Sequence, residues 1–493
     1  MVESTRMKEE LTITSKLEKL SSKLYVNSCI KSCNIFAMKD SFNLLGSFSG
    51  CVNGLAVLWH LSFIPFCFSQ LQLKTALPLK RNFPFLAIWN APTELCTKKF
   101  GVTYNLKPFP MVSTTRRSPL QQDIRIFFNG MVGYYPHYNE LTGQEFNGGI
   151  PQQVKMDEHL QKAAQDIEGL IPSNTSRGLA IIDWENWRPL WDRNWHHKFI
   201  YQHQSIELVQ QRDLSLTRQR AAAIAKTEFE DAAKQFLLKS LQLGKKLRPN
   251  QLWGYYLFPH CYNYMHKNKH RTYTGRCPSH AISRNNELLW LWQESTALYP
   301  SIYMSRIFKS SNNAKLFVQN RVREAMRVAA FSKENHSLPV YPYTRVVYRD
   351  SLNETLSEDD LIRTIGESAS LGAAGIVVWE SSNITQNQQS CSVLQSFIDD
   401  VLGRYILNVT RAARLCSRAL CSNKGRCLRK NWESSDYLHL NPSSFKIHRK
   451  RNGQLSVKGQ ESFSDLLYLA EKFTCQCYVG KNCDFQSPVR QHN

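Results

Sequence analysis

Asp183 and Glu185 form a D-x-E pair at the end of the apolar run GLAIID, which covers residues 178–183. Residues two apart at an extended strand end point to the same side, so the two carboxylates should be neighbours. Neighbouring carboxylates resist simultaneous ionisation, and the pKa of one of them should rise. A carboxylic acid that keeps its proton can protonate a leaving glycosidic oxygen. The pair therefore predicts acid–base hydrolysis of a glycoside, and a surface pair without chemistry is the alternative.

The surroundings of this pair are rich in aromatic residues. Indole rings offer flat apolar faces on which sugar rings can stack, although core packing is the alternative for each ring. Other apolar runs also end in aromatic or polar side chains, which would line a sugar-binding cleft if these ends meet. The tryptophans are Trp184, Trp187, Trp191 and Trp195, and the other candidates are Tyr255, Tyr256, Tyr299, Tyr303, Asp350 and Trp379.

Seven apolar runs must position these residues. Each is nearly continuously apolar, as expected for strands that are buried on both faces of a parallel sheet. The first three cover residues 83–90, 124–128 and 178–183, and the others cover 252–258, 297–304, 339–348 and 375–379.

Helical patterns lie between the runs. The clearest covers 216–243, where apolar residues spaced three and four apart share one face, and Gly244 and Pro249 predict its end. Segments 321–330 and 359–369 are similar. Strands that alternate with helices over this length predict an α/β fold, a (β/α) barrel, with catalytic groups at the C-terminal strand ends. A nucleotide site is disfavoured because no GxGxxG motif follows the first strand. The apolar face is formed by Ala222, Ala225, Phe229, Ala232 and Phe236.

The chain contains 14 cysteines, and six of them form a C-terminal cluster. The cluster reads C-x4-C-x5-C, then a long insert, then C-x-C-x5-C, which is close to the spacing of a disulfide-rich EGF-like module. Spacing alone leaves the pairing open. The cysteines lack the paired CxxC spacing of zinc sites, so no metal site is predicted.

A signal-like stretch and glycosylation sequons agree with an oxidising secretory compartment, in which disulfides form. An apolar stretch at 55–68 has the length of a signal peptide, and we expect cleavage near Ser69 with residues 1–37 as an upstream extension. The expected domains are 1–69, 70–410 and 411–493. The apolar stretch is too short and too interrupted for a transmembrane helix, so no membrane span is predicted. The C-terminus has no apolar tail, so no lipid anchor is predicted. Glycosylation sequons begin at Asn174, Asn335, Asn353, Asn383 and Asn408.

The formal net charge is +22, with 62 Lys and Arg against 40 Asp and Glu. Residues 401–493 hold 16 basic and 6 acidic residues, so nearly half of the excess lies in the last segment. Such a balance indicates an anionic partner, although a solvated surface is the alternative for the run 448–451. No nucleic-acid-binding motif accompanies it, which disfavours nucleic acid.

Several long segments resemble the animal hyaluronidases (glycoside hydrolase family 56), and most closely the sperm-surface branch. They read FLAIWNAPTELC, NGGIPQ, IDWENWRPLWDRNW, LRPNQLWGYYLFP, ESTALYPSIYM, GAAGIVVW and SSDYLHLNP. The resemblance implies a distorted TIM-like (β/α) barrel with a C-terminal EGF-like module, without metal or cofactor. It also implies five disulfides, which pair Cys96 with Cys391, Cys261 with Cys277, Cys416 with Cys427, Cys421 with Cys475, and Cys477 with Cys483.

The family's chemistry is hydrolysis of the β-1,4 bond after N-acetylglucosamine in hyaluronan, with retention, by attack of the substrate's own acetamido oxygen. By resemblance, Glu185 is the general acid and then the base. Asp183 orients the acetamido group, with Tyr256 hydrogen-bonded nearby. The partner is hyaluronan or a related anionic glycosaminoglycan such as chondroitin, and the expected state is a secreted, acrosomal or cell-surface monomer. Other cleft positions match Arg188, Tyr299, Asp350 and Trp379.

The chain departs from the family at Pro259-His260-Cys261, where relatives commonly read P-D-C. A carboxylate is lost there and a titratable base is gained, which could alter the pKa of Glu185. The loop from Cys261 to Cys277 is also two residues longer than in sperm-type relatives. A hyaluronan-binding adhesion protein of the gamete surface with little or no catalysis is therefore the alternative function. A chitinase-like lectin fits less well, because a basic chain suits an anionic polymer better than neutral chitin.

Overall fold

The computed structural model describes residues 73–113, 123–265 and 272–483. The chain divides into two units between Phe68 and Ser69, and all the described residues lie in the second. The upstream extension, the signal segment and the four N-terminal cysteines expected from the sequence all lie outside the described residues.

Two parallel four-stranded sheets form the centre of the second unit. The β-bridges Leu298–Val340 and Ser301–Tyr343, which are also parallel, join the edge of one sheet to the edge of the other. The result is the wall of a (β/α) barrel, as the sequence predicts. The first sheet has the order β2 (Met111–Val112), β1 (Leu86–Asn90), β12 (Gly375–Trp379) and β9 (Tyr343–Thr344); the second has β3 (Ile124–Phe127), β6 (Gly178–Ile182), β7 (Gln251–Leu257) and β8 (Tyr299–Pro300).

The barrel is distorted because β2, β8 and β9 are only two residues long. The run expected as one strand at 339–348 contains two. Its first strand, β9, belongs to the barrel, whereas β10 (Val347–Tyr348) pairs antiparallel with β11 (Ser351–Thr355). Pro339 and Pro342 have no N–H to give to a strand ladder, which limits the pairing of this segment.

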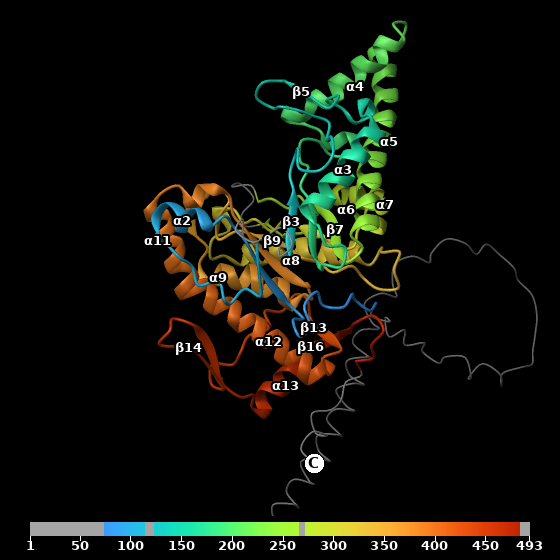
Figure 1. Ribbon diagram of the computed structural model, residues 1–493. Coiled ribbons are helices and arrows are strands. Elements are labelled where there is room, and N and C mark those ends of the chain that lie inside the picture. Colours follow the sequence, from blue (N-terminus) through green and yellow to red (C-terminus); the bar gives the residue numbers. More distant parts are fainter. Residues whose placement is uncertain (1–72, 114–122, 266–271, 484–493) are drawn as a thin grey trace, which may run out of the picture. The chain divides into compact units, whose positions relative to one another are not determined.

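The barrel interior is filled by side chains from both sheets, among them Ile88, Ile181, Tyr299 and Val377. A second apolar layer lies between the strands and the helices α3 (Met156–Leu170), α4 (Phe199–Arg212) and α5 (Arg218–Leu247). In Figure 1 these helices and the C-terminal elements α13 (Phe463–Lys472) and β14 (Phe445–Arg449) lie on opposite sides of the strands.

Helix α5 corrects two details of the sequence reading. Its buried face contains Ala221 and Ala233, whereas Ala222 and Ala232 are half-buried. The predicted stop at Gly244 is wrong, because the helix continues to Leu247. Gly244 is a packing glycine: a Cβ there would lie 2.9 Å from the indole ring of Trp253.

The remaining elements surround the barrel. Those of the N-terminal half are α2 (Glu94–Phe100), β4 (His137–Tyr138) and β5 (Glu145–Phe146). Those that follow β7 are α6 (Ser279–Glu287), α7 (Leu289–Glu294), α8 (Asn312–Ala329), α9 (Glu358–Leu361), α10 (Glu367–Ser370) and α11 (Gln388–Phe397). Those of the C-terminal part are α12 (Gly403–Cys421), β13 (Gly425–Arg429), β14 (Phe445–Arg449), β15 (Leu455–Gly459), α13 (Phe463–Lys472) and β16 (Phe473–Cys477).

The C-terminal segment is tied to the barrel by a continuous helix, because α12 runs through the boundary expected at 410/411. Buried residues of α12 share one core with barrel strands, among them Ile406 with Trp89. Five disulfides are formed among the described residues, and they are the same five pairs that the resemblance implies: Cys96–Cys391, Cys261–Cys277, Cys416–Cys427, Cys421–Cys475 and Cys477–Cys483.

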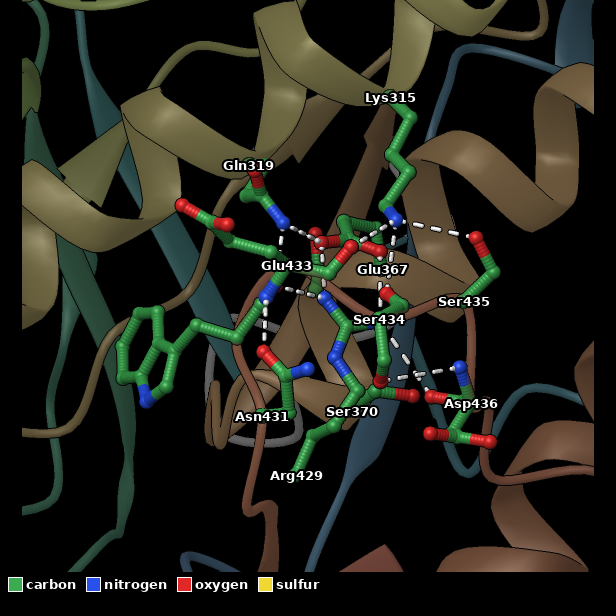
Figure 2. Close-up of polar contacts among 12 residues, drawn as sticks. Lys315, Gln319, Glu367, Ser370, Arg429, Asn431, Glu433, Ser434, Ser435 and Asp436 are labelled. Carbon is green, nitrogen blue, oxygen red and sulfur yellow. Dashed lines mark hydrogen bonds and ion pairs between the residues drawn. The ribbon is translucent and has the colours of Figure 1, made fainter. Parts of the chain in front are cut away.

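A buried polar network also joins this segment to the barrel helices (Figure 2). The guanidinium of Arg429 on β13 donates to both carboxylate oxygens of Glu367 on α10, at 2.5 and 3.0 Å, and both side chains are fully buried. Gln319 of α8 donates to the same carboxylate. Lys315 of α8 donates to the backbone oxygens of Glu433 and Ser434, each at 2.7 Å. The loop after β13 is thereby fixed against α8.

Candidate active site

The D-x-E pair lies where β6 ends. The backbone N–H of Asp183 still donates to Phe127 of β3 at 3.0 Å, which holds this residue at the strand end. The Glu185 side chain is 47% exposed, whereas Asp183 is mostly buried and its Oδ1 has no hydrogen-bond partner among the described residues. Burial, and then the charge of Glu185, raises the pKa of Asp183 to about 8. One carboxyl of the pair therefore keeps a proton near neutral pH.

Two cations adjoin Glu185. Arg188 Nη2 lies 3.3 Å from the Glu185 carboxylate, and Arg188 Nη1 donates to the Glu185 carbonyl oxygen at 2.7 Å. Lys198 Nζ donates to the same carbonyl oxygen at 2.7 Å. The Arg188 backbone is fixed in turn by Asn194, whose amide oxygen accepts from Arg188 N at 2.7 Å. These contacts shape the loop that carries Glu185.

A row of aromatic rings stands beside the pair. Tyr256 at the end of β7 lies 5.0 Å from Tyr343 and 6.2 Å from Tyr303, and Tyr303 stacks on Trp379 at 5.9 Å between centroids. Burial, followed by the charge of Glu185, raises the pKa of Tyr256, so its phenol stays protonated. The Tyr343 hydroxyl is buried without a hydrogen-bond partner. The row offers neutral O–H donors next to carboxylates.

A buried ion pair that was not among the candidates from the sequence supports this row. Arg345 Nη2 lies 2.5 Å from Glu380, whose other oxygen accepts from the Val346 N–H at 2.9 Å. The Arg345 guanidinium also lies 5.9 Å from the Tyr303 ring and 5.8 Å from the Trp379 ring. Glu380 directly follows Trp379 at the end of an apolar run, so the same strand-end signal that selects Asp183 was present here.

The structure separates the sequence candidates. Trp184 and Trp187 are buried and stack on Tyr135, and Trp191 packs on Phe229; Trp195 alone of the four is exposed. Core packing, the alternative stated for these tryptophans, therefore applies to the first three.

Two cleft candidates lie apart from the pair. Tyr299 is fully buried in the barrel interior, and its hydroxyl donates to the Leu252 carbonyl at 2.6 Å, so it does not face the cleft. The next tyrosine, Tyr303, takes that place at the barrel mouth. Asp350 is exposed in the turn between β10 and β11, where its Oδ1 accepts from Arg306 N at 2.7 Å.

His260 lies close to the cations of this site. Burial, and then the charges of Arg188, Arg193 and Arg321, lowers the pKa of His260 well below its ordinary value. The imidazole is therefore neutral where a histidine normally titrates, so it does not change its charge near neutral pH.

A barrel whose strand ends carry a protonated and an exposed carboxyl beside aromatic rings is typical of glycoside hydrolases that work by acid–base catalysis. The chain belongs to the hyaluronidase family, since the family model described as hyaluronidase matches residues 74–487. No group of three or more His, Cys, Asp or Glu side chains within the described ranges could hold a metal ion. No helix in this part of the chain is long and apolar enough to cross a membrane.

Two curated relatives illustrate the similarity. The chain is 46% identical to hyaluronidase PH-20 of Homo sapiens over 413 residues, which cover 84% of this chain and 80% of that protein. It is 45% identical to hyaluronidase-5 of Mus musculus over 412 residues, with coverage of 84% and 78%.

Solved structures are similar at lower identity. Bee venom hyaluronidase matches with a TM-score of 0.54 and 27% identity, over 66% of this chain and 99% of that one. The same enzyme in complex with a hyaluronic acid tetramer matches with a TM-score of 0.56 and 28% identity, over 65% and 98%.

Proposed function

We propose that this chain is an endo-acting glycosidase that hydrolyses the β-1,4 bonds of hyaluronan, with chondroitin as a related substrate. The observation that carries the proposal is the Asp183–Glu185 pair, in which one carboxyl keeps a proton near neutral pH and the other is exposed. Family membership and the hyaluronic acid tetramer bound to the similar bee venom enzyme support this substrate.

The first step breaks the bond between C1 of N-acetylglucosamine and the leaving oxygen. The acetamido oxygen of the same sugar attacks C1 and forms an oxazolinium ion, while Glu185 gives a proton to the leaving oxygen. A donating acetamido N–H favours the ionised form of Asp183, which moves the proton of the pair to Glu185. The positive oxazolinium then offsets the repulsion between the two carboxylates.

The second step returns the pair to its starting state. Water attacks C1, the bond from C1 to the acetamido oxygen breaks, and Glu185 takes a proton from the water. Two displacements at C1 give retention of configuration. Tyr256 and Tyr303 supply neutral donors near Asp183, and Trp379 offers an apolar face to a sugar ring.

The test is cleavage by the glycosylated protein and by Glu185→Gln, measured as new reducing ends between about pH 3.5 and 8. Glu185→Gln keeps the shape of the side chain but holds no acidic proton, so the rate should fall by about 10²–10⁴-fold. Glu168→Gln, at an exposed position on α3, is the matched control and should cleave like the wild type. Equal cleavage by Glu185→Gln would refute the assignment.

The second candidate is a hyaluronan-binding protein with little or no catalysis. His260 favours it, because an acidic side chain common in the family is missing next to Arg188. In that case the wild type would not cleave, and its binding of hyaluronan would survive Glu185→Gln and weaken with added salt.

The route to the cell exterior is part of the proposal. We infer a glycoprotein of the secretory pathway, secreted, acrosomal or held at the sperm surface, with residues 411–493 as an EGF-like module and a monomeric state. Five disulfides suit an oxidising compartment. Asn408 is half-buried on α12 and accepts from Leu440 N at 2.7 Å. The exposed sequon residues are Asn174, Asn335, Asn353 and Asn383.

A further inference from the structure

A small cavity adjoins the candidate active site through Arg188, which both contacts Glu185 and lines the cavity. Its volume is about 20 Å³, and a hollow needs roughly 10–15 Å³ to hold one water-sized species. Its apolar wall includes Phe258 and Leu288. The cavity therefore has room for a single small ion or water, and it is too small for a sugar.

The polar lining of this cavity is strongly cationic. Arg188, Arg193 and Arg284 line it together with His260, and no acidic side chain is among the described residues around it. Arg193 is only 8% exposed; among the described residues it has no ion pair, and its Nη2 is buried without a hydrogen-bond partner. The guanidinium carbon of Arg193 lies 3.3 Å from the ring centroid of Tyr262, which carries no charge to balance it. His260 Nε2 is also buried without a partner.

The carboxylates in the neighbourhood cannot supply the missing counter-charge. Glu185 already contacts Arg188, and the Glu324 carboxylate accepts hydrogen bonds from Asn285 and Arg327. Burial, and then Arg284 and Arg188, lowers the pKa of Arg193 to about 9, so its guanidinium is still positive at neutral pH. A buried positive charge without a partner is costly, and an anion of matching size would relieve that cost.

We propose that this cavity binds one small monovalent inorganic anion of the size of chloride, held by Arg193, Arg284 and His260. The neutral imidazole donates one N–H, and the two guanidinium groups supply charge and further N–H donors. Sulfate and the carboxylate of a sugar unit are larger than the space allows. The site is separate from the sugar cleft, and its existence does not depend on the proposed function.

Thermal unfolding at constant ionic strength tests the site, with gluconate replaced stepwise by chloride. A ligand that binds the folded state raises the unfolding temperature, and we expect a saturable rise of about 1–3 °C for the wild type. Arg193→Gln should abolish the chloride response, whereas Arg220→Gln, at an exposed position of α5, should keep it. An equal response in wild type and Arg193→Gln would overturn the proposal.

His260→Asp gives the sharpest comparison, because it places a permanent carboxylate in the cavity wall. We expect this variant to be more stable than the wild type without chloride and to show no chloride response. Crystals grown in bromide should show an anomalous peak inside the cavity of the wild type and none in His260→Asp. Water alone in the wild-type cavity at saturating bromide would refute the site, even where Arg193→Gln fails to fold.

Discussion

Asp183 and Glu367 carry carboxyl groups that are largely withdrawn from water, but the charged groups beside them have opposite signs. Glu367 is fully buried, and Arg429 and Gln319 satisfy its oxygens. The charged group with the largest effect on the pKa of Asp183 is another carboxylate, Glu185, and among the described residues one oxygen of Asp183 has no hydrogen-bond partner. Burial raises the pKa of both groups, but only at Asp183 does the neighbouring carboxylate raise it further.

This difference shows that burial alone does not create a reactive carboxyl. A buried carboxylate paired with a guanidinium is a fixed joint between elements, here between α10 and β13 (Figure 2). A buried carboxyl beside a like charge holds a proton that can move when the surroundings change. The first arrangement contributes to the fold, and the second is suited to acid–base chemistry.

The largest expected effect is at the joint. Glu367→Gln leaves the Arg429 guanidinium buried without a counter-charge, so the free energy of unfolding should fall by about 3–5 kcal/mol. Denaturant unfolding followed by tryptophan fluorescence measures it. Glu433→Gln, an exposed carboxylate on the adjoining loop, should change stability little. If Glu367→Gln and Glu433→Gln had similar stability, Glu367 would not have the structural role assigned to it here.

Asp183→Asn should have the opposite effect, a loss of activity without a loss of stability. The amide cannot become charged when the oxazolinium forms, so the turnover rate should fall by about 10²–10³-fold. Stability should not fall, because the variant loses a carboxyl that has no favourable charge partner closer than Arg188. Measuring turnover and unfolding on the same preparation separates the two effects. A loss of stability as large as that of Glu367→Gln would place Asp183 among the structural carboxylates.

The barrel and the D-x-E pair could be predicted from the sequence because both depend on local patterns. Continuous apolar runs indicate strands that are covered on both faces, and the pair directly follows one run. The disulfide pairs came from the family resemblance, since spacing alone leaves them open. Side-chain direction could not be predicted in this way: Tyr299 and Tyr303 lie four residues apart, yet one fills the barrel and the other stands at its mouth.

Contacts between segments that are far apart in the sequence could not be predicted either. Arg429 and Glu367 are 62 residues apart, and Arg345 and Glu380 are 35 apart, with no periodicity that links them. Gly244 resembles a helix stop in the sequence, but the need to accommodate the ring of Trp253 explains it. Each of these features depends on which elements become neighbours after folding.

The pH dependence of stability sharpens the same comparison. An Asp carboxyl in the unfolded chain ionises near pH 3.9, whereas folded Asp183 keeps its proton up to about pH 8. The folded state therefore binds more protons in this window, and wild-type stability loses a contribution as pH rises from about 4 to 8. Asp183→Asn lacks this loss, so its stability relative to the wild type should increase steadily as pH rises across the window. A difference that does not change with pH would show that the carboxyl ionises normally.

The smallest expected effect comes from removing a single tyrosine hydroxyl, either at the mouth of the barrel or in its interior. Tyr303→Phe removes a hydroxyl that hydrogen-bonds to Tyr256 beside the carboxylate pair. Such a bond contributes about 1 kcal/mol, so kcat/KM should fall by roughly five- to tenfold with little change in stability. Tyr299→Phe removes a hydroxyl that bonds the Leu252 carbonyl inside the barrel, and should cost about 1 kcal/mol of stability while leaving kcat/KM unchanged. If Tyr299→Phe lowered kcat/KM as much as Tyr303→Phe does, the interior and the mouth of the barrel would not be functionally distinct, and the assignment of Tyr303 to the cleft would be wrong.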